Sequence, residues 1–93
     1  MRIQLIQYIQ TKDDNFPHPI YKYFDSDIIP HKGDYISDSI WTETTQYKVD
    51  GVVIDYATNK CTITLEKCEE EWKTFAAFLD MAKLHKWTNN FEM

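Results

Sequence analysis

The chain has 93 residues, so we expect one domain, residues 1–93. Ten basic against fifteen acidic residues give a net charge of −5, which argues against nonspecific nucleic-acid binding, because that requires a basic face. Two Gly and three Pro exclude collagen-like and linker-like chains, and the apolar runs are too short for a membrane span.

Residues 1–66 are predicted to be rich in β-strands. Arg2 to Gln10 mixes Ile, Leu and Tyr with Gln, which is typical of a strand, and a bulge is expected between Leu5 and Ile6. A polar loop from Thr11 to Pro19 follows. Further short extended segments are predicted at Ile20 to Phe24, Asp34 to Ile36 and Ile40 to Trp41.

Residues 47–66 are predicted to form an antiparallel hairpin. Tyr47 to Tyr56 is rich in Val, Ile and Tyr, and Gly51 inside it indicates a bulge or sharp bend. In the second strand, Cys61, Ile63 and Leu65 alternate with polar residues, so these three are expected to face the core.

Residues 69–87 are predicted to contain a C-terminal helix, from Glu69 to Lys86. Glutamates at its start and basic residues at its end complement the helix dipole. A broad apolar arc is expected to face the core; it holds Trp72, Phe75, Ala76, Phe78, Leu79 and Ala82. A second, narrower apolar stripe at helical spacing predicts self-association as a homodimer; it holds Ala77, Met81 and Leu84. The alternative is that these three are incidental exposed residues.

These elements predict an α+β fold. It is expected to be a small antiparallel β-sheet or an SH3-like partly open barrel, with one C-terminal α-helix packed on it. Aromatic residues make up 15% of the chain, and large rings help a core this small. Five are assigned to the core: Tyr47, Tyr56, Trp72, Phe75 and Phe78.

The segment Ile29 to Ile36 has the sequence IPHKGDYI, and it is followed by Tyr47 to Val49 and Val52 to Ile54. It resembles the P-x-x-G-D-x-[IV] entry and following hairpin of small SH3-like β-barrel proteins, many of them short uncharacterised proteins of bacteria and phages. The resemblance covers residues 28–66 and implies a binding scaffold without naming a ligand. Gly33 and Asp34 also have a purely structural explanation as a turn.

Nothing in the sequence nominates a catalytic or metal site. The three histidines, His18, His31 and His85, lie far apart without a carboxylate or Cys at ligand spacing, so no metal or cofactor is predicted. Phosphate-binding, dinucleotide and nucleophile motifs are absent, and the chain is expected not to be an enzyme. Cys61 and Cys68 do not form a CxxC pair, Cys68 is expected to be partly exposed, and a reduced, cytoplasmic setting is expected.

Two aromatic groups are candidate binding residues. The first is a predicted partner-contact loop with an acidic rim; it holds Tyr35, Asp38, Ile40, Trp41 and Glu43. Its alternative is a loop folded over the core. The second is Tyr21 and Tyr23, which share one strand face as stacking platforms do. Core packing is the favoured alternative for this pair, and since Lys22 is the only base between them, direct nucleic-acid binding is not expected.

The sequence therefore predicts a non-catalytic, acidic, cytoplasmic binding protein that contacts another protein with a basic surface, without a membrane. A more specific form is a phage or mobile-element inhibitor of a host defence protein. The alternative is a protein that binds or sequesters a nucleotide-like small ligand in an aromatic pocket, for instance at a dimer interface. A hydrolase or metal enzyme would need a carboxylate pair or a metal.

Overall fold

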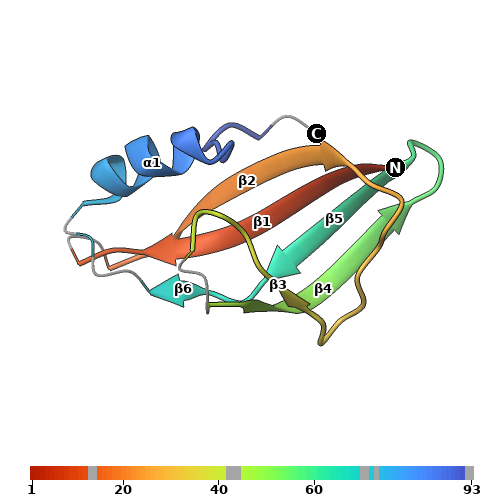
Figure 1. The fold of residues 1–93 in the computed structure, drawn as a ribbon, viewed down its shortest axis with the longest axis horizontal. Helices are drawn as coiled ribbons and strands as arrows, with labels where there is room; N and C mark the ends of the chain where they lie inside the picture. The colour runs from red at the N-terminus through yellow and green to blue at the C-terminus, as the bar shows by residue number, and fades with distance from the viewer. Residues whose placement is uncertain (13–14, 42–44, 70–71, 73, 92–93) are drawn as a thin grey trace.

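The protein is an α+β domain in which a curled, mixed β-sheet forms a half-barrel with one short helix beside it (Figure 1). The structure, a computed structural model, describes residues 1–12, 15–41, 45–69, 72 and 74–91. The strand order is β2-β1-β5-β4-β3, and β6 pairs with β1. The elements are β1 (Arg2–Gln10), β2 (His18–Asp25), β3 (Tyr35–Ile36), β4 (Tyr47–Asp55), β5 (Lys60–Leu65), β6 (Cys68–Glu69) and α1 (Phe75–Leu84). The predicted fold class is confirmed.

The sheet is mixed rather than antiparallel throughout. β1 pairs antiparallel with β2 but parallel with β5 and β6. The long connection after β2 carries the chain past β1 to the far side of the sheet, so β5 returns beside β1 in the same direction. β1 and β2 pair without a break from Arg2 to Ile9, so the predicted bulge between Leu5 and Ile6 is wrong.

The predicted hairpin is confirmed. β4 and β5 pair antiparallel, and their register shifts between Val49 and Gly51, where a bulge was expected. Cys61, Ile63 and Leu65 are all buried on the core face. Tyr56, in contrast, is 83% exposed, so its assignment to the core is wrong. β4 ends at Asp55, and Tyr56 lies in the turn that follows, where side chains no longer alternate between the two faces of the sheet.

The helix is shorter than predicted and begins at Phe75. Glu69 belongs to β6 and pairs with Gln10, and Glu70 and Glu71 lie outside the described residues. The side chain of the N-cap residue, Thr74, accepts a hydrogen bond from the backbone N–H of Ala77. Capping satisfies a backbone donor that the first helical turn leaves free.

The helix rests on the core through Phe78, Leu79 and Ala82, as predicted, and Phe75 packs partly buried against it. Ala76 is exposed, and Trp72 precedes the helix and is 38% exposed, so neither lies in the core. The later helix start explains Trp72, because it removes this residue from the helical periodicity, while Ala76 lies at the margin of the arc centred on Phe78, Leu79 and Ala82. Within the described ranges, no helix is long and apolar enough to cross a membrane.

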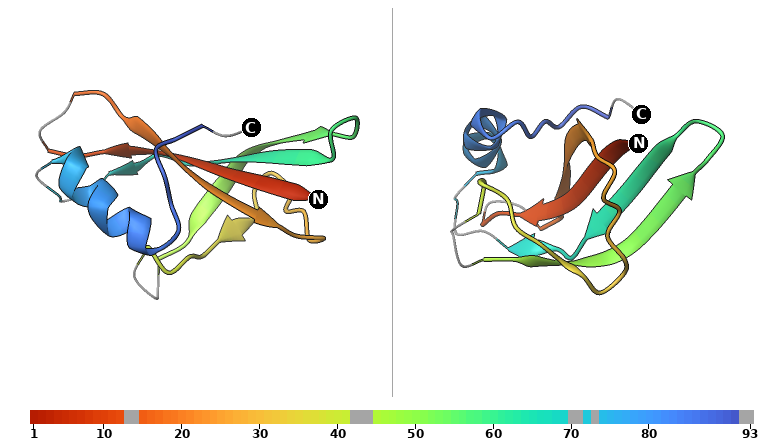
Figure 2. Two further views of the ribbon diagram at one scale, coloured as in Figure 1. Left: turned by 90° about the horizontal axis from the view of Figure 1, so that it is seen from above. Right: turned by 45° about the vertical axis from the view of Figure 1, so that its right-hand side comes forward.

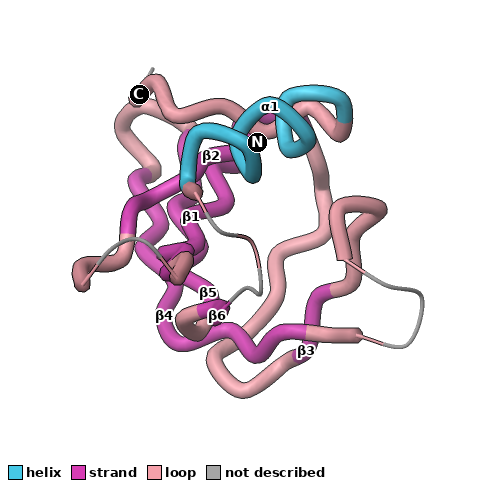
Figure 3. Tube along the Cα trace, turned by 90° about the vertical axis from the view of Figure 1, so that its left-hand side faces the viewer, coloured by secondary structure: helices cyan, strands magenta, loops and turns pink. Residues whose placement is uncertain are grey.

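The chain after α1 returns to the sheet at the edge of β2. Trp87 is 1% exposed and belongs to the core. Thr88 then exchanges two backbone hydrogen bonds with Tyr21, of 2.7 and 2.8 Å, and the tail runs alongside β2 (Figure 2). The end view in Figure 3 shows α1 and β3 on opposite sides of the curl. The tail thus covers part of an edge strand that would otherwise be open.

Candidate functional site

An open pocket of about 390 Å³ lies between the start of α1, β6 and the segment that leads into β4. We call it the aromatic pocket; its lining residues are Ile40, Trp41, Thr45, Tyr47, Glu69, Trp72, Phe78 and Met81. Four of these carry aromatic rings and one carries a carboxylate. The described lining contains no Lys, Arg or His. Its volume is in the range of small-ligand pockets, and its lining mixes aromatic and aliphatic side chains with polar groups in similar proportion.

The aromatic walls form two pairs. On one side the rings of Trp41 and Tyr47 are tilted, with centroids 4.7 Å apart. The Tyr47 hydroxyl lies 2.9 Å from the sulfur of Cys68, which ties this wall to β6. On the other side Trp72 meets Phe78 edge-on at 6.0 Å. Since Trp41 is 7% exposed and Trp72 is 38% exposed, the first forms the floor side of the pocket and the second its accessible rim.

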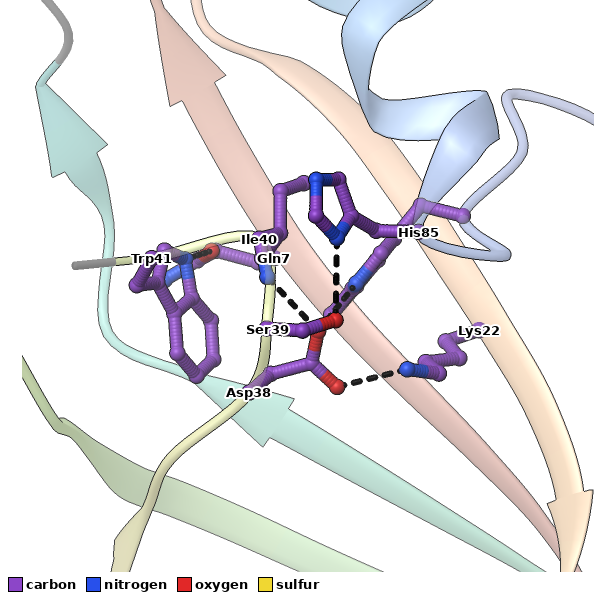
Figure 4. Close-up of polar contacts among 8 residues, drawn as sticks. Gln7, Lys22, Asp38, Ser39, Ile40, Trp41 and His85 are labelled. Carbon is purple, nitrogen blue, oxygen red and sulfur yellow. Dashed lines mark hydrogen bonds and ion pairs between the residues drawn. The ribbon is translucent and has the colours of Figure 1, made fainter. Parts of the chain in front are cut away.

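Asp38 fixes the loop that supplies Ile40 and Trp41 (Figure 4). Its carboxylate accepts hydrogen bonds from Lys22 Nζ at 2.6 Å, from Trp87 Nε1 at 3.1 Å and from the backbone N–H of Ile40 at 3.1 Å. Burial raises the pKa of Asp38, but these donors outweigh burial and hold the pKa below its usual value. Asp38 is therefore a charged structural anchor for one wall of the pocket.

Two further contacts hold the same loop from other elements. The Ser39 hydroxyl lies 2.9 Å from His85 Nδ1, at the end of α1, and Trp41 Nε1 donates to Gln7 Oε1 at 3.2 Å. Gln7 is 0% exposed and its Nε2 donates to the carbonyl of Glu66. A buried amide with partners at both ends favours one position of the Trp41 ring.

Glu69 is the charged residue of the aromatic pocket. Its side chain is 76% exposed, and Oε1 lies 3.4 Å from Lys67 Nζ. An exposed ion pair of this kind contributes little, typically 0–1 kcal/mol, because both charges stay hydrated. The carboxylate can therefore exchange Lys67 for another cation at low cost.

The structure separates the residues of the predicted partner-contact loop. Tyr35, in β3, is 62% exposed. Asp38 is mostly buried, while Ile40 and Trp41 turn inward and line the aromatic pocket. The predicted extended segment at Ile40 to Trp41 is wrong, because a turn forms there with a Trp41 N–H to Asp38 carbonyl bond of 3.1 Å. Glu43 lies outside the described residues. The alternative, a loop folded over the core, describes Ile40 and Trp41.

The predicted self-association stripe is also divided. Ala77 is exposed and Leu84 is 80% exposed, whereas Met81 is half-buried, packs against the core and lines the aromatic pocket. Met81 thus connects two sets of residues that the sequence analysis treated separately.

Tyr21 and Tyr23 do project from one face of β2, and their rings stack with centroids 6.3 Å apart. This face is opposite the core, because both pair with β1 residues that alternate with Ile3 and Leu5. Phe91 from the tail meets Tyr21 edge-on at 5.7 Å, and the Tyr23 hydroxyl donates to the carbonyl of Asn90. Burial, together with the nearby Tyr8 and Tyr23, raises the pKa of Tyr21. The tail therefore already occupies part of this platform.

The other two histidines and the two cysteines lie outside the aromatic pocket lining. His18 packs against Phe75 at 4.8 Å, and His31 lies 3.8 Å from Asp34 on the surface. In the part of the chain that the structure describes, no group of three or more His, Cys, Asp or Glu could hold a metal ion. Both cysteines are buried and unpaired with each other, so the expected partial exposure of Cys68 is wrong: its place in β6 turns it toward the core. Burial raises the pKa of the Cys61 thiol.

Sequence reasoning did not identify five of the lining residues as site residues: Thr45, Tyr47, Glu69, Trp72 and Phe78. Phe78 was assigned to the core and Glu69 to the start of the helix; only the fold brings them to one pocket. Comparison of the chain with protein-family models, with curated proteins and with solved structures gives no match. The case for a function therefore depends on the pocket and its charge.

Proposed function

We propose that the chain is a non-catalytic binding protein that contacts a basic partner protein at the aromatic pocket. The observation that carries the proposal is the pocket itself, which is open, is lined by four aromatic residues and the acidic Glu69, and has no basic residue in its described lining. Aromatic anchors in a partly exposed hollow are typical of the energetic centre of a protein interface.

Two further features support this proposal. The net charge of −5 favours encounter with a positively charged surface and disfavours phosphate-rich partners. The resemblance of residues 28–66 to small SH3-like barrels implies a binding scaffold. In its more specific form, the proposal is that the protein is a cytoplasmic phage or mobile-element inhibitor that occludes a basic surface of a host defence protein.

The proposal is tested by immobilising the protein and measuring capture of host proteins at 0.05, 0.15 and 0.5 M salt. We expect a captured basic protein whose retention decreases with salt, because the attraction between exposed charges is screened. Glu69→Gln should weaken the capture, and Asp80→Asn is the matched control, since it removes the same charge from an exposed position on α1. Absence of any captured protein, or equal loss in both variants, would contradict binding at the pocket.

A second candidate is the binding of a nucleotide-like small ligand, which the volume and aromatic walls of the same pocket favour. The Glu69 carboxylate opposes phosphates, so a nucleoside should bind better than its nucleotide. Thermal-shift measurements with paired nucleosides and nucleotides, including cyclic nucleotides, distinguish the candidates. A stabilisation that Trp72→Ala abolishes would support this one, and no shift across the panel would eliminate it.

A further inference from the structure

We infer that the aromatic pocket receives an arginine side chain of the partner, whose guanidinium stacks on the aromatic wall and pairs with Glu69. This inference rests on the proposed function and deepens it by naming the chemical group that enters the pocket. It is drawn from the lining residues, the exposure of Trp72 and the state of the Glu69 carboxylate.

The pocket should favour a cationic side chain over an apolar one. Aromatic faces carry negative electrostatic potential, so a cation close to a Trp or Tyr ring is attracted. The carboxylate of Glu69 adds a full negative charge at the same pocket. An apolar group would use the rings but would leave this charge without a new partner. A cation uses both.

Within the described lining, no basic side chain of the protein itself occupies the position beside the aromatic rings and Glu69. Lys22 is held by Asp38 at 2.6 Å and lies above the Trp87 ring, outside the lining of the pocket. Lys67 lies outside the lining, contacts Glu69 at 3.4 Å in an exposed ion pair and also donates to Gln10. The described lining thus supplies negative and aromatic groups, and the inference assigns the positive group to the partner.

The pocket should favour arginine over lysine. A guanidinium is planar and weakly hydrated, so it loses less than an ammonium when it stacks on an aromatic face. Its N–H groups also match the two oxygens of a carboxylate. Trp72 at the rim offers an accessible ring for stacking, and its backbone is held by a bond from the N–H of Lys12 to its carbonyl, of 3.1 Å.

The experiment titrates ¹⁵N-labelled protein with four five-residue peptides, Gly-Ser-X-Ser-Gly with blocked ends, in which X is Arg, Lys, citrulline or Leu. Citrulline is the matched control because it keeps the shape of arginine and removes the charge. We expect the Arg peptide to shift the indole N–H resonances of Trp41 and Trp72 at millimolar concentration. Citrulline and Leu should bind about 5- to 30-fold more weakly, as expected for a loss of about 1–2 kcal/mol.

Variants of the protein locate the effect. Glu69→Gln should reduce affinity for the Arg peptide and leave the citrulline peptide unchanged, whereas Asp80→Asn should change neither. Trp72→Ala should abolish the Arg response, and Tyr56→Ala, which truncates another exposed ring at the far turn of the hairpin, should not. Melting curves of all four variants verify that the fold is kept; if Trp72→Ala unfolds the chain, Trp72→Phe replaces it.

Four results would overturn the inference, the simplest being that the Arg peptide does not bind. Equal binding of the Arg and citrulline peptides would show that the positive charge of the side chain does not contribute to binding. Stronger binding of the Lys peptide would reject the choice of arginine, and binding of free methylguanidinium as tightly as the peptide would make the pocket a small-cation site. If capture of a basic partner remains sensitive to Glu69→Gln while the Arg peptide does not bind, the inference fails and the proposed function stands. If no basic partner is captured and the Arg peptide does not bind, both the inference and the proposed function fail.

Discussion

The β4–β5 hairpin and the aromatic pocket differ in how far apart their residues lie along the chain. The hairpin consists of neighbouring residues, and in β5 the side chains alternate between buried and partly exposed positions. The pocket is lined by residues between Ile40 and Met81, drawn from a turn, two strands and the helix.

The difference shows which interactions decide each region. In β5, burial follows from strand periodicity, so the core-facing side chains can be assigned from their neighbours in the sequence. In the pocket, burial follows from where the loop of residues 37–41 docks, which depends on Lys22, Trp87, His85 and Gln7. Substitutions at these distant contacts should therefore alter the pocket and leave the hairpin intact.

The largest effect is expected for Trp87→Ala. Trp87 is 1% exposed, packs 6.1 Å from Trp41 and donates to Asp38, so its removal leaves a large cavity and a lost hydrogen bond. The free energy of unfolding should fall by about 3–5 kcal/mol in urea denaturation. Trp72→Ala, which helix periodicity would have made equally severe, should cost about 1 kcal/mol or less at its exposed position. Equal losses would mean that the pocket rim belongs to the core.

A smaller effect is expected for Asp38→Asn. The substitution leaves Lys22 Nζ without its charged partner in a site where both side chains are less than one-fifth exposed, at a cost of about 1–3 kcal/mol at pH 7. Because the fold lowers the pKa of Asp38, its stabilisation is present above the unfolded pKa of about 4 and is lost as the pH falls through the folded pKa. Urea denaturation of both proteins at pH 7 and pH 3 should show the difference shrinking. A constant difference would contradict the ionised anchor.

The sequence was sufficient for the fold class, the hairpin and the inward faces of Cys61, Ile63 and Leu65, because these depend on period-2 alternation and on turn residues. It was also sufficient for the buried helix positions Phe78 and Leu79. Each of these features is determined by the pattern of residues within one short segment of the chain.

The remaining features have non-local causes. Gln7 reads as a polar strand residue, yet it is buried because Trp41 Nε1 and the Glu66 carbonyl satisfy its amide. Glu69 reads as a helix start, yet parallel pairing with Gln10 draws it into β6. The sequence around Gln7 or Glu69 does not indicate which distant residue will pair with it. The candidate site was therefore foreseen only in Ile40, Trp41 and Met81, whose residue types suggested contact surfaces but not a shared pocket.

Substitution of the two glycines by alanine is expected to change the free energy of unfolding by about 1 kcal/mol, with opposite signs at the two positions. Gly33 has a φ of +96° and its N–H donates to the carbonyl of Val49, so Gly33→Ala should destabilise by about 1–2 kcal/mol. Gly51 lies at the bulge, and a Cβ there would meet open space, so Gly51→Ala should change stability by less than about 1 kcal/mol and in the favourable direction. Thermal or urea denaturation checks both. A larger loss at Gly51 would show that the bulge needs glycine itself.

The smallest effect on stability is expected for Leu84→Asp, which tests the proposed homodimer. Leu84 is 80% exposed, so the substitution should change the free energy of unfolding by less than about 0.5 kcal/mol. If the helix face of Ala77 and Leu84 joins two copies, sedimentation equilibrium should give a dimer mass for the unmodified chain and a monomer mass for the variant. Met81→Asp is a poorer test, because Met81 also lines the pocket and packs against the core. A monomer mass for the unmodified chain would reject the dimer and leave the aromatic pocket as the candidate interface.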